Sequence, residues 1–153
     1  MDKTFLEAWE IHNRIHLYLL EAIKPAALDA VSASKGRRVA DQLAHVHNVR
    51  LMWLKAAAPE LLEGLSKIEN EVAADKKLLK KSLEDSGRAV SKLLERTGAA
   101  GKVKGFKPHA AAFLCYLISH ESQHRGQIVL TLKQAGHPVD KKVAYGIWEW
   151  GVR

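Results

Sequence analysis

The sequence contains one cysteine, Cys115, among 153 residues, so a disulfide framework is excluded and we expect a buried, structural thiol. Its longest uncharged stretch, residues 108–119, is shorter than the roughly 20 apolar residues of a membrane-spanning helix. The opening residues run into an amphipathic pattern without an apolar signal region, so we expect a cytoplasmic protein with no membrane partner. A hydrophobic content of 47% excludes disorder, and the length predicts a single domain over residues 1–153.

Proline is scarce, and the four prolines and several glycines separate segments whose apolar residues recur at helical spacing. The predicted helices cover residues 3–23, 38–57, 66–97 and 109–135. The third begins with a capping box, Ser66 to Glu69, and Gly87 is a possible break within it. No segment alternates apolar and polar residues long enough for a strand. We therefore predict an all-α four-helix bundle, with a short aromatic tail at residues 141–153.

The net charge of +7 is concentrated in one stretch. Residues 76–107 contain ten basic and three acidic side chains, while the rest of the chain has a net charge of zero. Such a stretch is either the solvated face of a lysine-rich helix or a nucleic-acid footprint. We favour the solvated face and do not expect a nucleic-acid partner.

Eight histidines are many for a chain of this length, and two pairs have i, i+4 spacing: His12 with His16, and His120 with His124. This spacing places both rings of a pair on one helical face, where they can share a metal ion. His120 and His124 also interrupt the apolar stripe of the fourth predicted helix. Buried imidazoles without partners cost free energy, which a metal ion in the bundle would remove. The alternative is a pair of core histidines bonded to neighbouring side chains.

A metal site typically needs a third protein ligand, which should come from another helix. His45 and His47 lie about 200° apart around the second predicted helix, so only one can point inward, and the pattern does not decide between them. Residues 120–124 also match the H-E-x-x-H motif of zinc proteases, in which Glu121 would be the base. The lack of a strand to hold a peptide argues against a protease.

Residues 119–128, SHESQHRGQI, resemble the HxxxHRGQ signature of the DinB-like metalloprotein family. The resemblance continues through residues 130–136 and through residues 42–54, where a histidine precedes Trp53 by eight residues. It implies a four-helix bundle, often a homodimer, that binds one divalent metal ion through three histidines. Residue by residue, the implied ligands are His45, His120 and His124, because His45 has the matching spacing to Trp53.

The resemblance also implies an activity, since the family includes thiol-dependent transferases and isomerases that use low-molecular-weight thiols. We expect a metal-dependent transferase or hydrolase acting on a small-molecule substrate, with zinc or nickel, or else iron or manganese, as the metal. Gln127 could orient a ligand, and His12 and His16 could line the pocket. No catalytic residue is assigned. The alternatives are a non-catalytic metal-binding or stress-related module, and a nucleic-acid-binding protein that uses residues 76–107.

Overall fold

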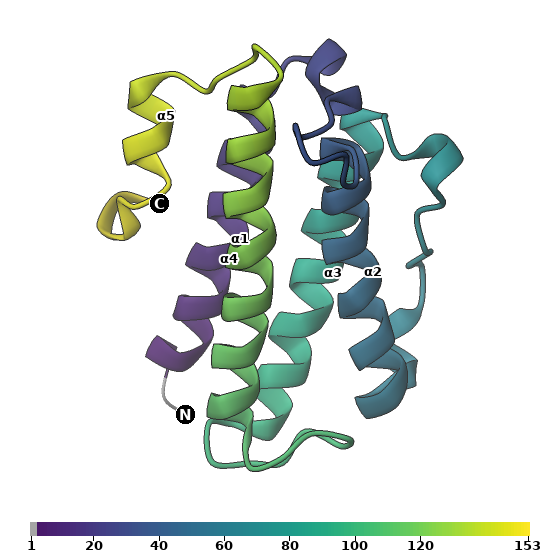
Figure 1. The fold of residues 1–153 in the computed structure, drawn as a ribbon. Helices are drawn as coiled ribbons and strands as arrows, with labels where there is room; N and C mark the ends of the chain where they lie inside the picture. Colours follow the sequence, from purple (N-terminus) through teal and green to yellow (C-terminus); the bar gives the residue numbers. More distant parts are fainter. Residues whose placement is uncertain (1–2) are drawn as a thin grey trace.

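The structure, a computed structural model, describes residues 3–153, and its regular structure there is entirely helical, as predicted. Met1 and Asp2, which belong to the segment where no signal region is expected, lie outside the described residues. The α-helices are α1 (Lys3–Ala22), α2 (Val39–Ala57), α3 (Lys76–Thr97), α4 (Ala110–Gln134) and α5 (Lys141–Gly146) (Figure 1). Short 3₁₀ turns cover Pro25–Asp29, Pro59–Leu62, Asn70–Val72 and Trp150–Val152. None of the helices described is both long and apolar enough to cross a membrane.

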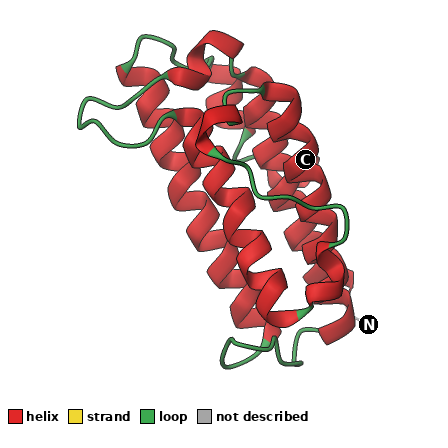
Figure 2. Cartoon of the chain, turned by 90° about the vertical axis from the view of Figure 1, so that its right-hand side faces the viewer, coloured by secondary structure: helices red, strands yellow, loops and turns green. Residues whose placement is uncertain are grey.

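The four long helices lie side by side, and α5 packs outside them near α1 and α4 (Figures 1 and 2). Helix α1 contacts α3 and α4, and α2 contacts the same two helices. Helices α1 and α2 therefore lie diagonally opposite each other. A side chain at the centre of α4 can therefore reach both of them, as Glu121 does.

The interior consists of two apolar clusters with a polar layer between them. One cluster includes Leu19, Leu43 and Ile128, and the other includes Trp9 and Phe113. Between these levels each long helix contributes fully buried polar side chains, which are His12, His16, Arg50, Ser86 and Glu121. Polar contacts within this layer join the helices to one another.

Helix α3 begins ten residues later than the capping box predicted, so that prediction is wrong. Its N-cap is Asp75, whose side chain accepts from the backbone N–H of Leu78 at 3.1 Å. Residues 66–68 instead lie against α2. There the side chain of Asn48 exchanges two hydrogen bonds with the backbone of Ile68, both at 2.9 Å. These contacts hold the segment in a non-helical conformation.

Gly87 does not break α3, which continues through it. The glycine instead allows α1 to approach closely, since a Cβ atom at this position would lie 2.3 Å from Nδ2 of Asn13. The indole of Trp9 donates to the carbonyl oxygen of Gly87 at 3.0 Å. The position is therefore a helix-packing contact rather than a helix end.

The C-terminal tail packs only part of its aromatic surface on the helices. Ile147 is buried and Trp150 partly buried, but Tyr145 and Trp148 are 72% and 75% exposed. Cys115 is also exposed, so the expectation of a buried thiol is wrong. It lies on the outer face of α4, two residues from the buried Phe113.

Candidate metal centre

All three predicted metal ligands come together between α2 and α4. The nitrogens that His45, His120 and His124 can offer lie within 4.8 Å of one another. The ring centroids of His45 and His124 are 4.7 Å apart, and those of His120 and His124 are 4.8 Å apart. The i, i+4 spacing within α4 produces the second distance, and the packing of α2 against α4 brings His45 to the pair.

One nitrogen of this histidine cluster has a protein partner, and another lacks one. Nδ1 of His124 lies 3.2 Å from Oε1 of Gln42, one turn before His45 on α2. With its proton on Nδ1, His124 donates to this oxygen and directs the lone pair of Nε2 away from it. Nδ1 of His120 is buried without a partner. An orphaned imidazole nitrogen beside two others fits a set of metal ligands.

The environment lowers the pKa of two of these three histidines, His45 and His124. Burial, together with the neighbouring His120 and His45, lowers the pKa of His124 to about 4. Burial and the cation of Arg37 also lower the pKa of His45. Neutral imidazoles are the form that binds a metal ion.

Aromatic side chains flank the cluster toward the N-terminus of α4. The ring of Tyr116 stacks on His120 with an interplanar angle of 11°. Tyr116 in turn contacts Trp53 and Phe106 at centroid distances of 5.6 and 5.4 Å. A largely apolar wall of this kind favours an organic ligand beside a metal ion.

His47 points away from this cluster, whereas His45 is part of it. Its Nε2 lies 2.8 Å from the carbonyl oxygen of Ser66, so it donates to the segment before α3. Gln127 is exposed and lines a surface hollow together with Gln42. The group that contacts His124 is Gln42, while a role for Gln127 stays a prediction.

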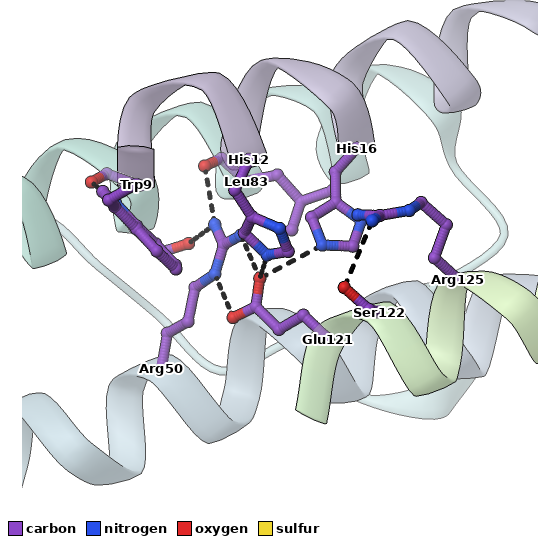
Figure 3. A network of polar contacts seen from close by, with 10 residues as sticks. Trp9, His12, His16, Arg50, Leu83, Glu121, Ser122 and Arg125 are labelled. Carbon is purple, nitrogen blue, oxygen red and sulfur yellow. Dashed lines mark hydrogen bonds and ion pairs between the residues drawn. The ribbon is translucent and has the colours of Figure 1, made fainter. Parts of the chain in front are cut away.

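The second histidine pair belongs to the polar layer between the four long helices, shown in Figure 3. Nε2 of His12 and of His16 lie 3.1 and 3.2 Å from the same oxygen, Oε1 of Glu121. Arg50 donates to both oxygens of this carboxylate, at 2.6 and 2.9 Å. All four side chains are fully buried. The atoms that His12, His16 and Glu121 could offer as metal ligands also lie within 4.8 Å of one another, so this group too could hold a metal ion.

The charges in this layer follow from its contacts. Although burial alone would raise the pKa of Glu121, the charge and hydrogen bonds of Arg50 hold it well below its ordinary value. Burial lowers the pKa of His16 to about 3 and also lowers that of His12. At neutral pH the layer therefore holds a carboxylate, a guanidinium and two neutral imidazoles.

These contacts weaken the protease interpretation. In the H-E-x-x-H motif the glutamate must activate a water molecule beside the metal ion. Here both oxygens of Glu121 are bonded to Arg50 from α2, and one also faces the histidines of α1. Glu121 joins the helices and has no free oxygen to act as a base.

Several cations of the basic stretch, residues 76–107, already have partners within the protein. Lys81 and Arg88 both pair with Asp85, and Arg96 pairs with Glu60. The ammonium group of Lys76 donates to two carbonyl oxygens near the end of α1, each at 2.8 Å. These contacts agree with a solvated helix face.

Sequence reasoning missed three residues around these sites, namely Gln42, Arg50 and Tyr116. Tyr116 lies one turn before His120, and helical spacing could have revealed it. The available signals for the other two were a glutamine three residues before His45 and an arginine within the same predicted helix. Neither signal identifies its partner, because each partner lies more than 70 positions away.

One of the comparisons with known proteins gives a match. The family model described as the DinB family matches residues 1–145. No curated protein and no solved structure gives a significant match. The chain belongs to the DinB family.

Proposed function

We propose that this protein binds one divalent metal ion through His45, His120 and His124 and is a metal-dependent enzyme acting on a small molecule. The observation that carries the proposal is the convergence of three imidazoles within 4.8 Å, one of them with an orphaned nitrogen. Three protein ligands leave a coordination position for water or substrate, as in catalytic zinc sites. We propose zinc or nickel first, then iron or manganese, because imidazole suits all of these ions.

The chemistry of such a site is that of a Lewis acid. A bound divalent ion would polarise an electrophile or lower the pKa of a thiol or water molecule at the open position. The protein's own residues supply the rest: Gln42 orients His124, and Tyr116 and Trp53 form an apolar wall. This combination supports a thiol-dependent transferase that uses a low-molecular-weight thiol, or a related hydrolase.

The polar layer around Glu121 is a weaker site for a metal ion. A cation there would compete with the guanidinium of Arg50, which lies 2.6 Å from the same carboxylate oxygen as His12 and His16. Two cationic charges beside one buried carboxylate are unfavourable. We therefore propose a structural role for His12 and His16, rather than contact with metal or substrate.

The proposal includes the architecture and state expected from the family. We propose that the four long helices form a four-helix bundle of the DinB type and that the protein is a cytoplasmic homodimer. The exposed Tyr145 of the tail supports an interface with another molecule, since aromatic residues are enriched at such surfaces.

The test is the metal content of protein purified without a histidine tag, measured by elemental mass spectrometry after reconstitution with each metal. The variants are His45→Ala and His124→Ala, with His47→Ala as the matched control from the same helix. We expect about one equivalent of metal in the wild type and in His47→Ala, as for a single three-ligand site. The two site variants should lose it.

The outcomes separate the alternatives. Failure of the wild type to retain any metal would refute the metalloenzyme proposal. Retention in His45→Ala and His124→Ala, with loss in His12→Ala, would move the site to the polar layer. If the expected result is obtained, thiol transfer to small electrophiles should be measured with the metal that binds best, and its absence would favour a non-catalytic metal-binding module.

A further inference from the structure

A second hollow lies on the opposite side of α4 from α2, between that helix and the C-terminal tail. Its volume is about 600 Å³, within the range of small-molecule pockets. Helix α4 contributes a stripe at positions 118, 122, 125 and 129, and the tail contributes Ile147, Trp148 and Trp150. The lining is mainly apolar, and its polar side chains are Ser122 and Arg125 together with the indole N–H groups.

Arg125 is unusual among the buried cations of the protein because it has few partners. It is only 7% exposed, and its one hydrogen bond runs from Nη2 to the hydroxyl oxygen of Ser122 at 3.2 Å (Figure 3). Its Nη1 is buried without a partner. Arg50, by contrast, donates four hydrogen bonds to Glu121, Leu83 and Ser86. A buried guanidinium with an unsatisfied N–H is costly unless something else completes it.

Among the described residues no carboxylate forms an ion pair with Arg125, whose one side-chain hydrogen bond is with Ser122. The nearest buried one, Glu121, is bonded to Arg50 and faces the two histidines. Glu149 in the tail is paired with Arg153 at 3.5 Å. With neutral His12 and His16, the buried side chains of residues 3–153 include two guanidinium groups and one carboxylate, which leaves one positive charge without a buried counter-charge.

The hollow is unfilled at the residue that follows Arg125. Gly126, the next residue, also lines the hollow, and a Cβ atom built on it would meet nothing within 4 Å. This glycine has ordinary helical backbone, so its conformation does not require glycine. A larger side chain at this position would fill the hollow that the glycine leaves.

We propose that this hollow binds a small monocarboxylate with an apolar body, whose carboxylate pairs with Arg125 while its apolar part lies against Trp148 and Trp150. A single negative charge matches the single uncompensated positive charge, which favours a carboxylate over a phosphate monoester carrying close to two charges. The guanidinium geometry suits a carboxylate, and the tryptophans provide flat apolar surface. The site is separate from the histidine cluster and does not depend on a bound metal.

The test uses octanoate as the probe and metal-free protein, so that the carboxylate cannot bind to a metal ion. Isothermal titration calorimetry compares octanoate with 1-octanol, which has the same chain without the charge. The variants are Arg125→Met, which keeps an apolar stem, and Gly126→Leu, which fills the hollow without touching the cation. The controls are Arg37→Met, which removes an exposed cation near the histidine cluster, and His45→Ala, which removes a predicted metal ligand.

We expect octanoate to bind the wild type and both controls with similar affinity, and to bind Arg125→Met at least tenfold more weakly, as for a lost charged hydrogen bond. Gly126→Leu should abolish binding while retaining the wild-type helical circular dichroism, and 1-octanol should bind no better than octanoate binds Arg125→Met. Equal affinities of wild type and Arg125→Met would overturn the proposal. So would loss of binding in His45→Ala, or no binding to the wild type at concentrations of about 5 mM. If Arg125→Met fails to fold, the comparison of the two ligands and Gly126→Leu still decide.

Discussion

Replacing Glu121 by glutamine should destabilise the protein severely, although the two side chains have almost the same shape. The substitution removes the negative charge that faces Arg50 through contacts of 2.6 and 2.9 Å. Arg50 is fully buried and cannot turn to water, so it remains as an uncompensated charge. Breaking a buried ion pair by removing one partner costs about 3–5 kcal/mol.

This cost is large enough to measure by two methods. For a domain of this length, 1 kcal/mol shifts the midpoint of thermal unfolding by about 2–4 °C, so the expected decrease is roughly 6–20 °C. Urea unfolding followed by circular dichroism should give the free energy directly. The matched control is Glu149→Gln, which removes an exposed partner of Arg153 and should cost no more than about 1 kcal/mol.

The double variant Arg50→Met with Glu121→Leu isolates the charge itself. Since apolar replacement of a whole buried pair is often close to neutral, it should be clearly more stable than Glu121→Gln alone. The reasoning would be refuted if Glu121→Gln unfolded within about 1 kcal/mol of the wild type. A stable Glu121→Gln variant that lost chelator-sensitive peptide cleavage would restore the protease interpretation.

Two further predictions concern stability. Because His16 has a folded-state pKa of about 3, below the unfolded value near 6.5, the unfolded chain takes up the proton first, and stability is lost as the pH falls below 6.5. Between pH 7 and pH 5 this residue alone should cost about 2 kcal/mol, measurable by urea titrations at each pH, and a His16→Gln variant with an unchanged pH dependence would contradict it. Gly136 follows α4 with φ of 84°, so replacing it by alanine should lower the free energy of unfolding by about 1 kcal/mol. Gly126 lies within the helix, so Gly126→Ala should leave the free energy of unfolding unchanged or raise it. Equal effects of the two substitutions in thermal unfolding would refute the assignment of their conformations.

The positions of the helices were largely predictable from the sequence. The end of α4 near Gly136 and the limits of α2 agree with the predicted segments to within one or two residues. At these points the local sequence signal, such as a glycine after the last turn, decides where the helix ends. The predicted start of α3 at Ser66 was wrong, because residues 66–68 form hydrogen bonds with His47 and Asn48 instead of a first helical turn. No local pattern reveals these long-range contacts.

The candidate metal centre was predictable only in part. The spacing of His120 and His124 placed both on one face of a helix, and that inference needs no tertiary information. The choice of His45 over His47 depended on resemblance to a family, since both lie in one helix and its rotation is set by packing. That packing directs His47 to Ser66 and brings His45 to His124.

The sequence by itself determined that this is an all-helical protein with a pair of histidines suited to a shared ligand, because helical periodicity and i, i+4 spacing are local properties of the chain. Only the tertiary structure decided which charges meet. Glu121 lies beside the two histidines in the sequence motif, yet it bonds to Arg50, 71 positions away, and Arg125 is left with an unpaired N–H. The reason is physical: a buried charge selects its partner by proximity in the folded core, and that proximity is created by helix packing rather than by sequence neighbours.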